Sequence, residues 1–252
     1  MRVITGIVAS IALVGAAIAA AEPQADCNVP DWLIPAQSEL NRVSSAIKDH
    51  HRLDISVVGS RSSALPGPDG ARFSYPAQLE QALKERLPGN DIKVTAHIAS
   101  GQTTAEMAAD LPKALADDRP ALAIWQAGTV DALRGVEPED FRVSLDQGLD
   151  AIAAANADAL MMNMQYSPRT ESMLGVVPFA DVMHWVAEQR GVVLFDRLAI
   201  MRYWSDEGTF DLYAPTTGYA MARRVHECIG RALASQIISA AHLDADKMQT
   251  TR

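Results

Sequence analysis

The sequence predicts an α/β domain built on a parallel sheet with helices on both faces. Short apolar runs alternate with segments of helical spacing, and neither a repeat nor a domain-scale linker interrupts them from about residue 30 onward. Such alternation is typical of βαβ units, whose crossover helices cover both faces of the sheet. The composition fits a packed domain rather than a disordered chain, since 48% of the residues are hydrophobic and 21% are charged.

The first predicted strand runs from Leu53 to Gly59, which is apolar, rich in β-branched residues and ends in glycine. A polar stretch rich in glycine and proline follows over 60–74. A helix is then predicted over 75–86, where Pro76 suits the first turn. The remaining elements alternate in the same way: strands over 92–99, 121–127, 159–164 and 192–195, and helices over 103–116, 141–155, 180–190 and 219–241.

The ends of these strands predict where a site lies. Ligands of parallel sheets bind beyond the carboxyl ends of the strands. Polar residues in the segments that follow the strands are therefore the candidates for chemistry. Those segments begin at Gly59, Ser100, Gly128 and Gln165, and a further one precedes Tyr219.

The first 21 residues predict a secretory signal. Met1 and Arg2 give a positive start, an apolar run follows, and the alanines at 19–21 supply the small residues of a cleavage site. A retained membrane anchor is the alternative, because the run is nearly the ~20 residues that span a bilayer. We expect a signal peptide over 1–21, an N-terminal extension over 22–49 and one domain over 50–252, in the periplasm or secreted.

Charge and cysteine content limit the partners. The net charge of −9, without a cluster of basic residues, predicts neither nucleic-acid binding nor attraction to anionic membranes. After signal cleavage we expect no stable membrane insertion. Cys27 and Cys228 are the only two cysteines, and they either form a disulfide in an oxidising compartment or remain two buried thiols. Neither a metal site nor another cofactor is expected.

Five segments resemble the sequence blocks of the SGNH (GDSL-type) hydrolase family. The resemblance covers nearly all of the chain from about residue 50. It implies a flavodoxin-like three-layer α/β/α sandwich with about five parallel strands, and hydrolysis of ester or acyl groups on small molecules and carbohydrates. The matching stretches are GSRSSA at 59–64, ASGQTT at 99–104, WQAGTVDAL at 125–133, MQYSPR at 164–169 and PTTGYA at 215–220.

The residues that the resemblance makes catalytic are mostly replaced. It implies a serine nucleophile, an oxyanion hole from a glycine amide and an asparagine, and a late Asp-x-x-His pair. Gly101 is retained, but Arg61 occupies the nucleophile position and Val130 the asparagine position. The loss of a nucleophile or an oxyanion donor removes most of the rate enhancement, so the sequence predicts a catalytically degenerate member.

The base is missing in either alignment of the last block. One register places Tyr213 at the histidine position and Phe210 at its aspartate position. The register shifted by one residue places Asp211 at the aspartate position and Ala214 at the histidine position. Neither supplies an imidazole to activate a serine.

A rearranged catalytic site is the alternative. Ser60, Ser62 and Ser63 flank Arg61, and Ser62 lies deepest in the loop, although all three could instead satisfy backbone groups. His97, near the end of the second strand, could reach Ser62 or could be a core histidine. Two other histidines are poorer candidates: we expect His184 to pack in its helix, and His226 lies seven residues into the last helix.

Arg61 suggests binding rather than hydrolysis. Its guanidinium, loop N–H groups and Gly101 would form a positive concave site for a carboxylate or phosphate. The alternative is an ion pair between Arg61 and Asp131, for which a helix-capping role is also expected. Further binding residues are expected at Gly128, Val130 and Tyr213, with Tyr166 also lining the cleft and most of the tryptophans at 125, 185 and 204 in the core.

The sequence therefore supports two functions. The first is an exported SGNH-like protein that is catalytically degenerate and binds an acylated or anionic small molecule or glycan. The second is an active periplasmic esterase or deacylase with a rearranged nucleophile site, using Ser62 and His97. A scaffold for an envelope complex is a third interpretation.

Overall fold

The computed structural model describes residues 27–36, 38–214 and 218–243, and it confirms the α/β prediction. The expected signal peptide over 1–21 lies outside these residues. Five parallel strands form one sheet in the order β2-β1-β3-β4-β5. Their bounds are β1 (Arg52–Gly59), β2 (Asp91–Ile98), β3 (Leu122–Gln126), β4 (Asp158–Met162) and β5 (Val193–Phe195).

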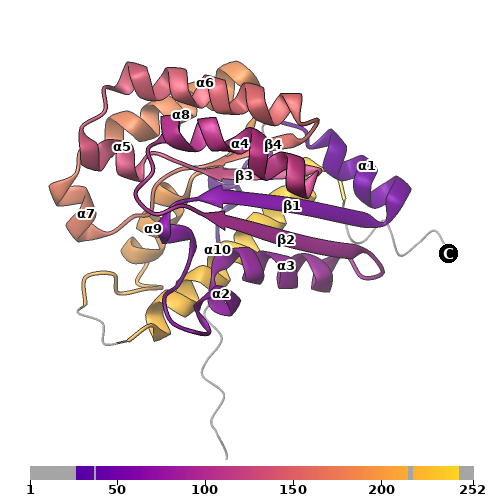
Figure 1. The fold of residues 1–252 in the computed structure, drawn as a ribbon. Helices are drawn as coiled ribbons and strands as arrows, with labels where there is room; N and C mark the ends of the chain where they lie inside the picture. The colour runs from indigo at the N-terminus through magenta and orange to yellow at the C-terminus, as the bar shows by residue number, and fades with distance from the viewer. Residues whose placement is uncertain (1–26, 37, 215–217, 244–252) are drawn as a thin grey trace, which may run out of the picture.

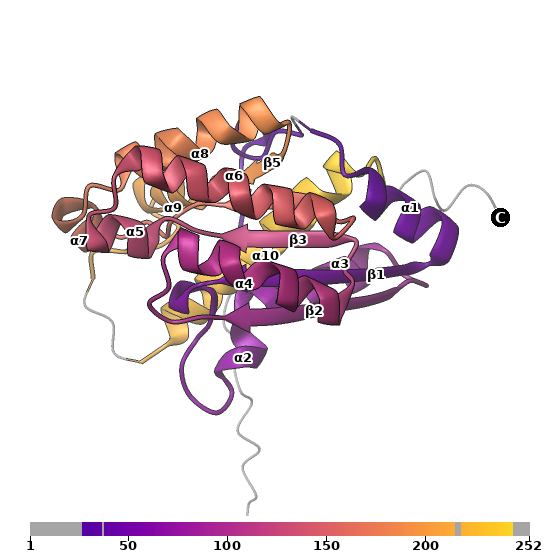
Figure 2. The ribbon, with the colours of Figure 1, turned by 45° about the horizontal axis from the view of Figure 1, so that its top comes forward.

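Helices cover both faces of this sheet and produce the expected three layers (Figure 1). One face carries α4 (Thr104–Asp118), α6 (Pro138–Ala154) and α8 (Val177–Arg190), and the other carries α3 (Tyr75–Arg86) and α10 (Ala220–Ala240). The view in Figure 2 shows the same division from another side. All five of these helices were predicted, with ends that differ by up to three residues.

Several helices were not predicted, because they are short or fall in segments interpreted as loops. α1 precedes the first strand and buries Val43 and Ile47, so part of the N-terminal extension belongs to the same core. α9 begins two residues after β5. The unpredicted elements are α1 (Asn41–His50), α2 (Gly70–Phe73), α5 (Thr129–Arg134), α7 (Pro168–Met173), α9 (Arg197–Asp206) and the 3₁₀ turns η1 (Asp31–Leu33) and η2 (Arg61–Ser63).

The prediction that most of the tryptophans at 125, 185 and 204 lie in the core is confirmed. Trp125 and Trp204 are fully buried. Gly148 on α6 makes room for Trp125, since a Cβ there would lie 2.1 Å from the indole ring. Trp185 is half exposed, because it lies on the outer side of α8, where the Arg142 guanidinium carbon is 5.9 Å from its ring centroid.

Cys27 and Cys228 form a disulfide, which decides between the two expectations for these residues. The bond joins the N-terminal extension to α10 across 201 positions of sequence. Within the described part of the chain, no helix is both long and apolar enough to span a bilayer. The same residues contain no cluster of histidine, cysteine and acidic side chains that could hold a metal ion.

Candidate functional site

The loop after β1 forms what we call the serine cluster: Ser60, Ser62 and Ser63 around the side chain of Gln126. Gln126 ends β3, and its Oε1 atom is the common acceptor. Ser60 donates to it from the backbone N–H at 3.0 Å and from Oγ at 2.9 Å, and Ser63 Oγ donates at 3.0 Å. Ser62 Oγ is further away, at 3.4 Å. One buried amide oxygen therefore holds the whole turn.

Close packing explains why the chain turns here. A Cβ on Gly59 would lie 2.5 Å from Ser63 Oγ, so only glycine allows this approach. Ser60 and Ser63 are buried, and the Tyr75 hydroxyl donates to Ser63 Oγ at 3.0 Å. Both hydroxyl groups are thus satisfied within the protein, as buried polar groups usually are. The sequence offered a signal for Gln126, because it is the polar end of an otherwise apolar strand.

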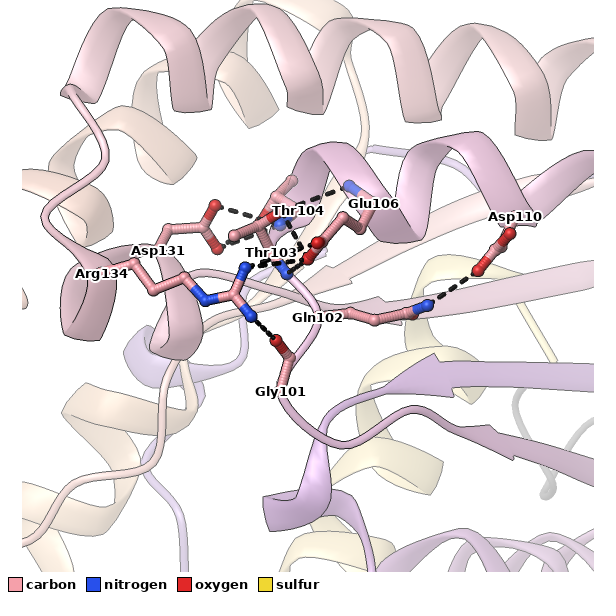
Figure 3. Close-up of polar contacts among 8 residues, drawn as sticks. All are labelled: Gly101, Gln102, Thr103, Thr104, Glu106, Asp110, Asp131 and Arg134. Carbon is pink, nitrogen blue, oxygen red and sulfur yellow. Dashed lines mark hydrogen bonds and ion pairs between the residues drawn. The ribbon is translucent and has the colours of Figure 1, made fainter.

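The loops after β2 and β3 are joined by polar contacts from α5 (Figure 3). Asp131 is buried and accepts hydrogen bonds from Thr104 N at 3.0 Å and Thr104 Oγ1 at 2.7 Å. Arg134 donates to the Gly101 carbonyl oxygen at 2.7 Å. Asp131 therefore caps the start of α4, where N–H groups lack partners within the helix. Its role is to fix the loop that carries Gly101.

The residues that were expected to bind a ligand in this region have different environments in the structure. Gly128 adopts φ +97°, and a Cβ there would lie 2.5 Å from the Met164 sulfur. Val130 is half-buried on α5. Arg61 is exposed at the start of η2, and it forms no ion pair with any residue that the structure describes. The expected pair of Arg61 with Asp131 is therefore wrong, because Asp131 bonds to Thr104 instead.

His97 and His184 bind carboxylates outside the serine cluster. His97 Nε2 lies 2.6 Å from Asp118 Oδ2 at the end of α4, and the same oxygen accepts from Ser56 Oγ. No hydrogen bond joins His97 to Ser62 within the described residues. His184 Nε2 lies 2.7 Å from Asp196 Oδ2, and this bond raises the pKa of His184. The prediction that His184 packs in the core is wrong, since its side chain is half exposed on α8.

A second site, which we call the Arg197 pocket, lies between the ends of β4 and β5 and the first turns of α10. Its cavity has a volume of about 370 Å³. Its lining combines polar and apolar side chains. It is lined by residues 165–167, Arg197, Met201, Asp211, Leu212, Ala214, Met221, Ala222, Val225 and His226.

Arg197 is a fully buried cation without an acidic partner among the described residues. Its Nη2 donates to Ser62 O at 3.1 Å and Gln165 Oε1 at 3.0 Å, and Nη1 donates to Ser62 Oγ at 3.3 Å. Its Nε atom is buried without a hydrogen-bond partner. Burial lowers the pKa of Arg197 to about 10, so the side chain remains charged at neutral pH. Such a charge is costly to bury unless an anion compensates it.

His226 lies beside Arg197 as a neutral acceptor. Its Nδ1 accepts from Tyr75 N at 2.9 Å, and its ring stacks on the Tyr75 ring with centroids 5.9 Å apart. Burial, together with the charge of Arg197, lowers the pKa of His226 to about 3. The position of His226 along α10 suggested a poor candidate, yet it lines the pocket, because the pocket extends along the first two turns of this helix.

The last block contributes an aspartate but no imidazole. Asp211 Oδ1 accepts from Tyr213 N at 3.1 Å and Ala214 N at 3.0 Å, and both Asp211 and Ala214 line the pocket. Tyr166 is buried in the pocket wall, and burial, aided by the neighbouring Tyr213 hydroxyl, raises its pKa to about 12. Tyr213 itself is 67% exposed.

Arg197 was missed because the segment after β5 was not among the loops expected to form a site. The rule that ligands bind beyond strand ends applies to it equally, since Arg197 follows Phe195 by two residues. A charged residue directly after a buried strand was the available signal.

Comparison with known proteins agrees with this architecture. The sequence is 33% identical to esterase TesA of Pseudomonas aeruginosa over 112 residues, 44% of this chain and 54% of that protein. The chain thus spans about half the length of the curated relatives it matches. The crystal structure of TesA superposes with a TM-score of 0.60 at 24% identity, covering 74% of this chain and 99% of that one.

The structural similarity extends to AlinE4, described as an SGNH-hydrolase family esterase. Its crystal structure gives a TM-score of 0.52 at 24% identity, covering 78% of this chain and 96% of that one. These likenesses identify the SGNH hydrolase fold. The family described as non-GDSL lipase-like matches residues 26–243, which is most of the sequence. The chain therefore belongs to the non-GDSL lipase-like family.

Proposed function

We propose that this protein binds a carboxylate with an apolar body in the Arg197 pocket and does not hydrolyse esters through a serine. The observation that carries the proposal is the fully buried Arg197 guanidinium, which has no acidic partner within the described residues and lines a cavity. A carboxylate is the planar anion that best matches the forked donors of arginine.

The serine cluster gives little support for a nucleophile. A serine nucleophile needs a base within hydrogen-bond reach. Ser62 Oγ instead contacts Gln126 Oε1 and Arg197 Nη1, neither of which can accept its proton in catalysis. No histidine in the described residues bonds to any serine of the cluster, and Ala214 stands in the segment where the family resemblance places the base.

The lining of the pocket suggests the rest of the ligand. Arg197 and Gln165 form a polar end, whereas Met201, Leu212 and Met221 supply apolar wall. A volume of about 370 Å³ is within the range of small-molecule sites. A short or medium-chain fatty acid, or another acyl compound with a free carboxylate, matches a pocket with both polar and apolar lining.

We propose further that the protein acts in the periplasm or is secreted. The Cys27–Cys228 disulfide supports this, because such bonds persist mainly in oxidising compartments.

Binding and hydrolysis are tested together on the purified protein. Sodium octanoate is titrated by calorimetry, and p-nitrophenyl acetate hydrolysis is followed by absorbance. We expect Arg197→Met to weaken octanoate binding about 100-fold, the equivalent of one strong charged hydrogen-bond pair. Arg134→Met is the matched control, because it removes an exposed guanidinium at the same end of the sheet and should leave affinity unchanged.

Two results would contradict the proposal. Hydrolysis well above buffer that disappears in Ser62→Ala would establish the active esterase instead. Octanoate binding that is absent, or equal in Arg197→Met and the unmodified protein, would remove the carboxylate site.

A further inference from the structure

The side of α10 that faces away from the Arg197 pocket lines a second hollow. The pocket uses Met221, Ala222, Val225 and His226 of this helix. The next face of the same two turns carries residues at positions i, i+3, i+4 and i+7, which lie together on a helix surface. This second hollow, of about 530 Å³, is lined by Ala220, Arg223, Arg224 and Glu227 of α10 and by Arg72, Phe73, Gln78 and Gln81 of α2 and α3.

Three guanidinium groups gather in this hollow, which we call the arginine groove. Arg72 and Arg223 both contact Phe73, with guanidinium carbons 4.7 Å and 4.0 Å from the ring centroid. Arg224 lies 5.5 Å from the ring centroid of Phe210, and its Nε is buried without a hydrogen-bond partner. The ring contacts thus hold these three cations on one side of the helix.

The positive charge of the groove is not neutralised within the described residues. None of the three arginines forms an ion pair there, and the one acid of the groove, Glu227, pairs with Arg231 at 2.9 Å. Cations held close together repel one another. The groove is thus locally positive, although the net charge of the whole chain is −9. A bound anion would relieve this repulsion.

We infer that the arginine groove is a second binding site, for the oxyanion of a phosphate ester. A phosphate monoester or diphosphate presents several oxygens, each able to accept from a forked guanidinium, so it can use all three arginines at once. Arg223 and Arg224 also lie in the first two turns of the 21-residue helix α10, whose amino end favours a negative charge. This site is separate from the Arg197 pocket and does not depend on the function proposed for it.

Binding of inorganic pyrophosphate to the purified protein tests the inference at low ionic strength. We expect saturable binding that Arg223→Gln/Arg224→Gln weakens at least tenfold. Arg52→Gln is the control for a loss of positive charge elsewhere, because it removes one guanidinium from the start of β1, at the opposite end of the strands. Arg224→Lys keeps the charge but loses the fork, and we expect an intermediate affinity. The thermal midpoint of each variant shows whether it remains folded.

A second arm distinguishes a soluble phosphate from a lipid headgroup. The same proteins are sedimented with vesicles of phosphatidylglycerol or of phosphatidylcholine. Binding to the anionic vesicles alone, lost in Arg223→Gln/Arg224→Gln, would assign the groove to a phospholipid; pyrophosphate binding without vesicle binding would assign it to a soluble phosphate ester. No binding in either arm, or equal loss in Arg52→Gln, would overturn the inference.

Discussion

The serine cluster and the Arg197 pocket share one residue, Ser62, but differ in how their polar groups are satisfied. In the serine cluster, four donors converge on Gln126 Oε1 and the Tyr75 hydroxyl completes Ser63. In the pocket, Arg197 keeps an unpartnered Nε and has no carboxylate among the described residues. Among the residues that the structure describes, the first region leaves only a neutral amide group, Gln126 Nε2, without a partner, whereas the second leaves part of a buried charge without one.

This difference is the reason why we propose a binding role for the pocket and not for the serine cluster. Buried polar groups in folded proteins are normally paired, and an orphaned charged group costs far more than a neutral amide, so Arg197 is the stronger candidate for contact with a ligand. The loop that resembles the nucleophile block is stabilised by internal hydrogen bonds. The pocket beside the last block retains a cavity, a charge and an apolar wall.

The largest expected effect comes from breaking the serine cluster at its centre. Gln126→Met would leave Ser60 N, Ser60 Oγ and Ser63 Oγ without their common acceptor. Because an unsatisfied buried donor costs about 1–3 kcal/mol, we expect the free energy of unfolding to fall by about 3 kcal/mol. Urea unfolding measures it.

Gln102→Met is the control for this substitution. Among the described residues the Gln102 side chain bonds to Asp110 alone, at the surface, so its loss should change the free energy of unfolding by less than about 0.5 kcal/mol. A similar, small effect at Gln126 would mean that the serines find other partners and that the cluster is not the structural unit described above.

The next effect concerns His226 and acid stability. Its folded pKa of about 3 lies below the ordinary 6.5, because burial disfavours the charged ring. As the pH falls through 6.5, His226 becomes protonated in the unfolded chain, whereas in the folded protein it stays neutral until about pH 3. The free energy of unfolding therefore decreases by about 1.4 kcal/mol per pH unit within that range.

His226→Asn tests this by removing the titrating group while keeping an acceptor near Nδ1 for Tyr75 N. Urea unfolding at pH 6 and pH 4.5 should show a decrease about 2 kcal/mol smaller in the variant than in the unmodified protein. Other groups, including His184 with its raised pKa, titrate in both proteins and cancel in the difference. Equal decreases in the two proteins would show that His226 is accessible and charged.

The sequence predicted the two regions unequally, for physical reasons. Strands and the main helices follow from local periodicity, and Leu53–Gly59 was found within one residue of β1. The serine loop follows a strand visible in the sequence. The pocket depends on Arg197 and His226, which are 29 residues apart and line the same cavity, one at the start of α9 and the other in the second turn of α10. The proximity of these two side chains depends on the tertiary structure, which strand and helix patterns do not predict.

The smallest expected change in stability is the one that sharpens the comparison most. Arg197→Met removes three hydrogen bonds, to Ser62 O, Ser62 Oγ and Gln165 Oε1, but it also removes an unpaired buried charge. These contributions oppose each other, so we expect the free energy of unfolding without ligand to change by less than about 1 kcal/mol, or to rise. Arg42→Met is the control, because Arg42 bonds to Asn156 and pairs with Asp158. Its replacement removes these contacts without removing an unpaired buried charge, so the free energy of unfolding should fall. If Arg197→Met lost about as much stability as Gln126→Met, the guanidinium would be as structural as the serine cluster, and the pocket would have no unmet charge to attract an anion.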